Sequence, residues 1–221
     1  MIQIYKDPHY IHKFAIYGER HSGTNFLEQT IKQTFHIDIT HFFGGKHWMG
    51  FAEPNSIHYK DRGILFFGIV RHPYDWISGF FNMPHHVPRN NRNKLEDFLL
   101  NEWYSVDSKN QEIMQDRYYE TKLRYKNIFE LRKYKTKYLS ETMPLIAQNY
   151  VLITYEFLVN YYDKFLNIIS DRFKLLKRGT GSRPFYKPYA ILDDHIKNIV
   201  NSHIDWSVES VFGYYPRWTK E

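Results

Sequence analysis

The chain has 221 residues, of which 30 are Lys or Arg and 24 are Asp or Glu, so its net charge is +6. This length fits a single domain over residues 1–221, and the modest basic excess favours a small anionic ligand over a nucleic acid, which requires a clustered basic face. The sequence has no cysteine, no run of 18 apolar residues and no apolar N-terminal core, which excludes disulfides and thiolate chemistry and predicts a cytoplasmic protein without a membrane partner.

The first predicted element is a strand over Phe14–Tyr17 that leads into a glycine loop. Gly18 and Gly23 bound this loop, and an apolar helical spacing follows it. Strand, glycine loop and helix start form an arrangement whose backbone N–H groups bind phosphate. In a Walker A loop, Lys and a hydroxyl residue follow the second glycine, and they contact the β/γ-phosphates and Mg²⁺. Here Thr24 and Asn25 occupy those places, which favours a nucleotide without a γ-phosphate or a metal.

Further along the chain, apolar segments alternate with helical patterns. Strands are predicted at His36–Phe42, Ile64–Val70 and Tyr150–Thr154, the second of which is continuously apolar, as in a strand buried on both faces. Helices are predicted from Pro73 through Phe80, from about Leu95 to Ala147 with an end marked by Pro144, through Phe157 to Ile168, and before Asp205. This alternation predicts an α/β fold, a three-layer domain with a central, mostly parallel sheet flanked by helices.

A possible anion-binding arginine follows the second long strand. Ligands of open α/β sheets bind beyond the carboxyl ends of strands, where the guanidinium of Arg71 can bind phosphate through two N–H groups. Ser78 comes seven residues later, about two helical turns, and can present its hydroxyl on the same side. The alternative interpretation is that Arg71 pairs with a nearby carboxylate such as Asp75.

These two elements together resemble the two cofactor-binding segments of the sulfotransferase family. Residues 21–26 (His-Ser-Gly-Thr-Asn-Phe) are similar to its 5′-phosphosulfate loop, commonly Lys-Ser-Gly-Thr-Thr-Trp, with His21 at the lysine position. Residues 69–78 are similar to its 3′-phosphate segment, although Ser78 follows the arginine by seven residues where eight are usual. Tyr155–Leu158 and Asp205–Tyr214 are weaker similarities. The resemblance implies a P-loop-type fold and sulfuryl transfer from 3′-phosphoadenosine-5′-phosphosulfate (PAPS), without a metal.

The resemblance also implies roles for individual residues. The 5′-phosphate would be held by Ser22, Gly23, Thr24 and Asn25, and the sulfate would be braced by Arg20, His21, Lys46 and backbone N–H groups. The 3′-phosphate would be held by Arg71 and Ser78 and covered by a basic loop with Lys177, Arg178 and Gly179. Phe26 stands where some members stack a Trp on adenine. Further contacts to the acceptor or nucleotide are possible for Arg124, Arg132 and Lys135.

Transfer to a hydroxyl also needs a base, and the glycine-rich loop 44–50 offers one. We expect His47 to take the proton, because an unperturbed imidazole titrates near neutral pH, and Lys46 to stabilise the bridging oxygen. His41 is the second candidate for the base. The polar loop Met83–Asn93 is long enough for a lid or an acceptor wall. No metal site is expected, since His85 and its neighbour His86 have no carboxylate or cysteine at ligand spacing.

Two other functions are compatible with these motifs. A P-loop nucleotide or small-molecule kinase would need the Walker lysine and an Asp at a strand end for Mg²⁺, and neither is evident. A binding module without turnover is favoured by His21 at the position of the loop lysine. The sequence leaves the acceptor open among carbohydrate, small alcohol and peptide tyrosine, and it does not indicate an oligomeric state.

Overall fold

The computed structural model describes residues 1–5, 10–47, 63–179 and 192–217. Its centre is a five-stranded sheet in the order β1-β7-β4-β2-β3, in which β1 is antiparallel to β7 and the other pairs are parallel. The strands are β1 (Ile2–Tyr5), β2 (Lys13–Tyr17), β3 (Asp38–Ile39), β4 (Ile64–Val70) and β7 (Tyr150–Thr154). The α/β class and the mostly parallel sheet are confirmed, whereas β1 was not predicted and β3 is shorter than expected.

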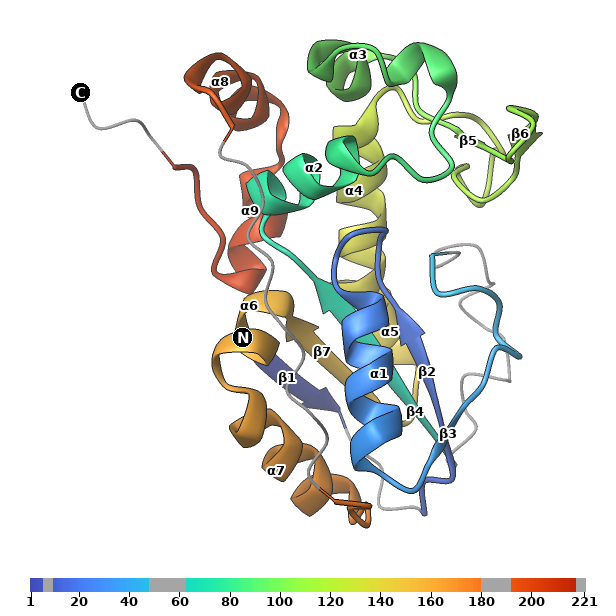
Figure 1. Cartoon of the computed structure of the whole chain (residues 1–221), viewed down its shortest axis with the longest axis vertical. Helices are drawn as coiled ribbons and strands as arrows, with labels where there is room; N and C mark the ends of the chain where they lie inside the picture. Colours follow the sequence, from blue (N-terminus) through green and yellow to red (C-terminus); the bar gives the residue numbers. More distant parts are fainter. Residues whose placement is uncertain (6–9, 48–62, 180–191, 218–221) are drawn as a thin grey trace.

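Helices cover both faces of this sheet (Figure 1). In the described ranges they are α1 (Thr24–Thr34), α2 (Pro73–Asn82), α3 (Leu95–Leu100), α4 (Ile128–Lys137), α5 (Met143–Ile146), α6 (Tyr155–Asn160), α7 (Tyr162–Phe173), α8 (Asp194–His203) and α9 (Trp206–Glu209). Helix α2 begins at Pro73 as predicted, because proline lacks the N–H group that a first turn leaves without a partner. No helix within these ranges is long and apolar enough to cross a bilayer.

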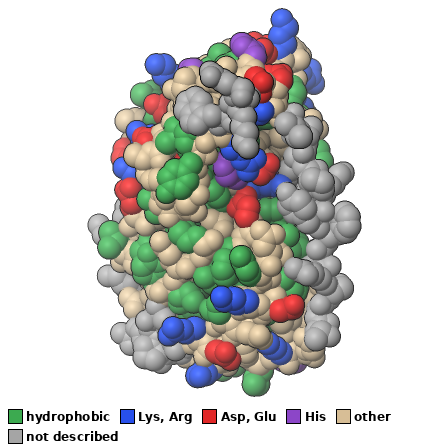
Figure 2. All heavy atoms as spheres, turned by 90° about the vertical axis from the view of Figure 1, so that its left-hand side faces the viewer, with side chains coloured by type: hydrophobic (Ala, Val, Ile, Leu, Met, Phe, Trp, Pro, Cys, Tyr) green, Lys and Arg blue, Asp and Glu red, His purple; other side chains and the backbone are tan. Residues whose placement is uncertain are grey.

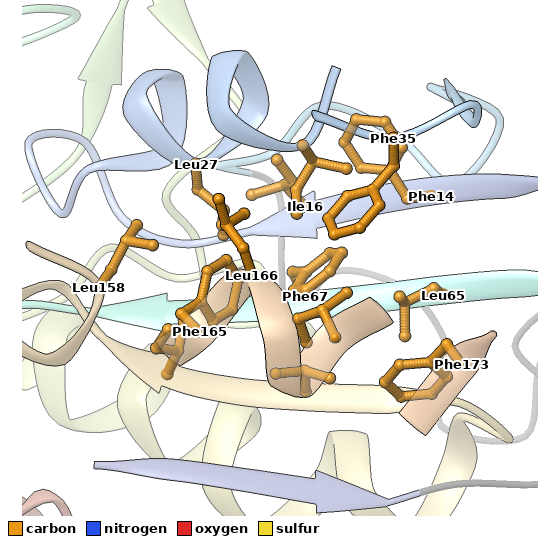
Figure 3. Packing of buried hydrophobic residues seen from close by; sticks show 14 of the residues in the cluster. Phe14, Ile16, Leu27, Phe35, Leu65, Phe67, Leu158, Phe165, Leu166 and Phe173 are labelled. Carbon is orange, nitrogen blue, oxygen red and sulfur yellow. The ribbon is translucent and has the colours of Figure 1, made fainter. Parts of the chain in front are cut away.

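Alternating side chains of the central strands enter two different cores. Phe14, Ile16 and Phe67 pack on one face with Leu27 of α1 and Phe165 of α7 (Figure 3). The intervening residues of β2 and β4 pack on the other face against α5 and the π-helical turn before it. All seven residues of β4 are buried, as predicted for a strand covered on both faces. A third cluster joins α2, α3, α4 and α8.

The strand order places a crevice between the carboxyl ends of β2 and β4. From β2 the chain passes through α1 to β3 on one side, and β4 then pairs with the opposite side of β2. Connections that leave two neighbouring strands in opposite directions open the sheet edge between them, which is where ligands of α/β sheets bind. The glycine loop after Tyr17 and the segment after Val70 both start at this edge.

The segment 95–147 is not the continuous helical region that its apolar spacing predicts. Only α3 and the elements from α4 onward are helical, and between them β5 (Ser105–Val106) and β6 (Glu112–Ile113) form an antiparallel hairpin. The carboxylate of Asp107 accepts the backbone N–H groups of Lys109 and Gln111, each at 2.8 Å. Such side-chain bonds to the backbone stabilise a turn in competition with a helix. Pro144 also lies in the first turn of α5 rather than at a helix end.

Candidate functional site

A cavity of about 620 Å³ lies at the crevice between β2 and β4. Eight of the predicted site residues line it: Arg20, His21, Gly23, Thr24, Asn25, Phe26, His47 and Arg71. Met83, Pro84 and His85 also line it and belong to the loop that was predicted as a lid or acceptor wall. Tyr155, the first residue of α6, completes the described lining, and only its weak motif similarity pointed to it in the sequence.

The glycine loop presents the start of α1 to this cavity. Gly23 has φ 100°, and a Cβ atom there would lie 2.4 Å from Cδ2 of Tyr155, so only glycine fits. Gly23 is the N-cap of α1 but supplies no side-chain cap, and the first turn contains no acidic residue. The N–H groups of Thr24, Asn25 and Phe26 have no acceptor one turn earlier in the helix, which makes this end of α1 suited to an anion.

Ser22 has a structural position within the same loop. Its side chain is buried, and its hydroxyl donates to the carbonyl of Glu19 at 2.6 Å, while its backbone N–H donates to that carbonyl at 3.1 Å. It closes the turn of the loop and is not among the described residues that line the cavity. The structure therefore separates Ser22 from the loop residues that reach the cavity.

Arg71 reaches the cavity from the end of β4, whereas Ser78 does not. The Arg71 guanidinium lies over the ring of Tyr155, with its carbon 4.4 Å from the ring centroid, and its Nη1 is 3.4 Å from the carbonyl oxygen of His21. Asp75, the alternative partner considered above, is 3.6 Å from Arg217. Ser78 is buried in α2 and is not among the described lining residues. Of this predicted pair, the structure brings only Arg71 to the glycine loop.

His47 is oriented by the first residue of the glycine loop. Its Nδ1 is 2.7 Å from the carbonyl oxygen of Gly18, which can only accept, so Nδ1 carries the proton. Burial is the main cause that lowers the pKa of His47 to about 4, so the ring is neutral at pH 7 and Nε2 retains its lone pair. A half-buried imidazole in this tautomer, at the cavity wall, can accept a proton from a bound hydroxyl.

Lys46 lies across the first turn of α1. Its ammonium contacts the side-chain oxygen of Asn25 and is 3.4 Å from Glu28, and its backbone carbonyl accepts the N–H of Gly18 at 3.0 Å. The loop that carries Lys46 thus places an ammonium group at the start of α1, beside Asn25. Asn25 is one residue after the position of the lysine in a Walker A loop. The other histidine considered as a base, His41, is exposed and is not among the described lining residues.

The side chain of His21 connects the glycine loop to the loop after α2 through a hydrogen bond. Its Nε2 is 2.9 Å from the carbonyl oxygen of Met83, so Nε2 donates, and its ring stacks on Phe80 with 5.3 Å between centroids. Burial lowers the pKa of His21 below its usual value. A neutral imidazole whose Nε2 proton is already shared cannot replace the charge of a lysine at this position.

Arg20 belongs to a buried network that sequence reasoning missed. Its guanidinium donates to Glu19 at 3.0 Å, to the hydroxyl of Ser105 at 3.0 Å, to the carbonyl of His85 at 3.1 Å and to the carboxylate of Asp116. Four of its five donors are therefore committed within the protein, so Arg20 shapes the cavity wall and has little left for a ligand. Its partners include Asp116, 96 positions away, for which the sequence contains no local signal.

The basic loop at 177–179 lies at the far end of α1. The N–H of Arg178 donates to the carbonyl of Thr34 at 2.7 Å, and Lys177 bridges to Phe35 and donates to Asn167 at 2.6 Å. Because α1 has 11 residues at about 1.5 Å each, this end is about 15 Å from the glycine loop. The structure does not bring Lys177, Arg178 or Gly179 to the cavity, and residues 180–184 of that loop lie outside the described ranges.

The other basic residues considered as contacts are paired elsewhere. Arg124 binds Glu102 and Glu112, each at 2.7 Å, on the hairpin surface. Arg132 is buried against Glu209 at 2.6 Å, and Nη2 also donates to the backbone carbonyl of Arg71 at 2.8 Å. Arg132 therefore supports the segment that carries Arg71 rather than contacting a ligand.

Charge is distributed differently over the described surface and in the cavity. On the face drawn in Figure 2, Lys and Arg side chains lie toward both the upper and the lower end with Asp and Glu among them, and the visible His side chains lie in the upper half. Within the described lining of the cavity there is no Asp or Glu. Likewise, no group of three or more His, Asp or Glu converges as a metal site in the part of the chain that the structure covers.

No family model, curated protein or solved structure matches the chain.

Proposed function

We propose that the protein is a sulfotransferase that moves the sulfuryl group of PAPS to an acceptor hydroxyl, on a three-layer domain of the P-loop type. The observation that carries this proposal is the composition of one cavity. It combines a helix start without a cap, the arginine at the end of β4 and a neutral histidine, and its described lining includes no carboxylate. Cations and N–H groups suit an anionic donor, and the neutral histidine suits a hydroxyl acceptor.

Different residues of the cavity bind the two phosphate groups of the donor. The N–H groups of Thr24 and Asn25 bind the 5′-phosphate, and Arg71 binds the 3′-phosphate from the end of β4. Phe26 is half-buried, with its ring 5.8 Å from that of Tyr155, and it presents an aromatic surface to the adenine. PAPS supplies a sulfuryl group whose bond to the phosphate oxygen is the one that breaks.

His47 and Lys46 carry out the transfer. Nε2 of His47 takes the proton of the acceptor hydroxyl as that oxygen forms its bond to sulfur, and the S–O bond to the 5′-phosphate breaks in line. The electron pair of the broken bond stays on the phosphate oxygen. Lys46, beside Asn25, and the N–H groups of α1 stabilise the charge there. This assigns to Lys46 the charge that the family places in the loop, because His21 is neutral and bound to Met83.

Calorimetry and a transfer assay test the proposal together. PAPS, its product 3′-phosphoadenosine-5′-phosphate (PAP) and ATP with Mg²⁺ are titrated, and sulfate transfer is then measured on carbohydrate, small-alcohol and peptide-tyrosine acceptors. We expect PAP to bind at least as tightly as ATP and His47→Ala to reduce transfer by about a hundredfold or more, the range for a general base. The control is His195→Ala, which alters an imidazole that is 69% exposed on α8.

The same measurements separate the alternatives. A Mg²⁺-dependent preference for ATP contradicts the proposal in favour of a kinase. Tight PAP binding without transfer to any acceptor indicates a binding module, which is the function that the neutral His21 favours. Unchanged transfer by His47→Ala contradicts the role of His47 as the base.

A further inference from the structure

Four charged groups form a closed network beneath the cavity. Glu19, Arg20, Asp116 and Lys135 are all buried, and the two cations each contact both carboxylates. The two positive and two negative charges balance, which allows the group to be buried together. Although burial opposes it, the charges of Arg20 and Lys135 hold the pKa of Asp116 below its usual range.

Lys135 connects this network to the loop that carries the proposed base. Its ammonium is 2.5 Å from Asp116, 2.8 Å from Glu19 and 2.9 Å from the backbone carbonyl oxygen of His47. The contacts to Asp116 and to the carbonyl of His47 are hydrogen bonds and the contact to Glu19 is an ion pair, so partners on three sides hold the ammonium. Lys135 itself is on α4, whose Ile128 and Leu131 pack in the cluster that joins α2, α3, α4 and α8.

Hydrogen bonds therefore hold both the backbone and the side chain of His47. Lys135 binds its backbone carbonyl, Gly18 accepts from its Nδ1, and the neighbouring carbonyl of Lys46 accepts from the N–H of Gly18. Of these three bonds, only the one from Lys135 comes from outside the glycine loop and the loop of the base. Removing it would leave the backbone at His47 free to turn the imidazole away from Gly18.

We propose that Lys135 is a positioning residue that fixes the orientation and tautomer of His47, with Asp116 holding Lys135 in place; its catalytic consequence rests on the proposed function. Asp116 also accepts from Trp103 at 3.2 Å and from Ser105 at 2.6 Å, so the hairpin insertion is part of the support. Lys135 contacts neither donor nor acceptor and acts only through His47.

The test compares a charge-balanced variant with a matched surface variant. Lys135→Met alone leaves a surplus negative charge inside the protein and can unfold it, so the main variant is Lys135→Met combined with Asp116→Asn. This double variant keeps the pair of Glu19 and Arg20. The control is Lys137→Met on the same helix, whose side chain is 44% exposed and 3.4 Å from Glu141. Lys135→Arg tests whether a cation with several donors rescues the position.

The first readout is the ¹⁵N NMR signal of the His47 imidazole, which reports the tautomer without any substrate. We expect a single Nδ1–H tautomer in the wild type and in Lys137→Met. In Lys135→Arg most molecules should keep this tautomer, whereas the double variant should show a mixture of the two tautomers. The second readout is transfer, which we expect to fall about tenfold to a hundredfold in the double variant, the cost of a misplaced catalytic group, with PAP affinity within threefold.

The two readouts distinguish failure of this inference from failure of the proposed function. If the double variant keeps the wild-type tautomer of His47, the positioning role of Lys135 is overturned, whatever happens to transfer. If the tautomer becomes mixed while the wild type transfers sulfate to no acceptor, the positioning role stands and the proposed function fails. A lower unfolding temperature with an unchanged tautomer would show a purely structural role and also overturn the inference.

Discussion

Two arginines line the cavity, and their partners give them different roles. Four donors of the Arg20 guanidinium are bound to Glu19, Ser105, Asp116 and a backbone carbonyl. The guanidinium of Arg71 instead lies over the ring of Tyr155, at the end of β4. Both residues looked equally suited to an anion in the sequence, because local spacing does not show which donors are used inside the protein. The distinction matters for mutagenesis, since we expect Arg20 variants to alter the fold and Arg71 variants to alter the proposed binding of the nucleotide.

We expect Arg71→Ala to weaken PAP binding about tenfold to a hundredfold or more, the equivalent of about 1.5–3 kcal/mol for a charge-assisted hydrogen bond. Arg71→Lys should recover part of the affinity, because lysine keeps the charge but loses the planar pair of donors. Calorimetric titration with PAP measures both variants. Arg124→Ala, on the hairpin surface, serves as the control and should bind as the wild type does; equal affinities for Arg71→Ala and this control would refute a 3′-phosphate role.

At the scale of elements, the glycine loop joins three parts of the molecule. Its first glycine donates to the loop of Lys46, its His21 binds the carbonyl of Met83, and its last glycine lies against Tyr155 of α6. The apolar run that ends at Gly18, the spacing of the two glycines and the helical apolar spacing after them predicted the strand, the loop and the start of α1. It could not predict these three attachments, since each partner comes from a distant segment.

Gly23→Ala tests how tightly the loop lies against α6. A side chain at φ 100° costs about 1–3 kcal/mol in backbone strain, and here the new Cβ atom would also meet the Tyr155 ring. Gly213→Ala is the matched control, because Gly213 has φ 78° but no heavy atom within 4 Å of an added Cβ. Urea unfolding should show the larger loss of stability for Gly23→Ala, accompanied by weaker PAP binding. Equal losses would mean that Tyr155 moves aside easily.

At the scale of the whole molecule, histidines whose pKa is lowered by partial or full burial make stability depend on pH. Burial is the main cause that lowers the pKa of His72 to about 3, and Arg217 and Arg132 lower it further. His47, at about 4, is the second such group. The unfolded chain, with histidine near 6.5, binds more protons than the folded chain between these values, so stability falls as the pH decreases from about 6.5 toward 3.

We expect the unfolding temperature to be lower at pH 5 than at pH 7. His72→Gln should reduce this pH dependence, because glutamine does not titrate between these pH values. His72 is the better position to change, since it is buried between Tyr74 and Tyr214 and is not among the described cavity residues. Calorimetric scans at several pH values measure both proteins, and identical slopes for the variant and the wild type would contradict the assignment to His72.

The α/β class, the three main strands of the sheet and the glycine loop with its helix start could all be predicted from the sequence. These features depend on local periodicity and on the conformational freedom of glycine, which can be read from neighbouring residues. The folded structure was needed to show that Lys46 reaches Asn25, that Asp116 and Lys135 lie beneath the cavity, and that Lys177 and Arg178 lie at the opposite end of α1. Such contacts depend on how distant segments bury and balance their charges, for which local spacing has no signal.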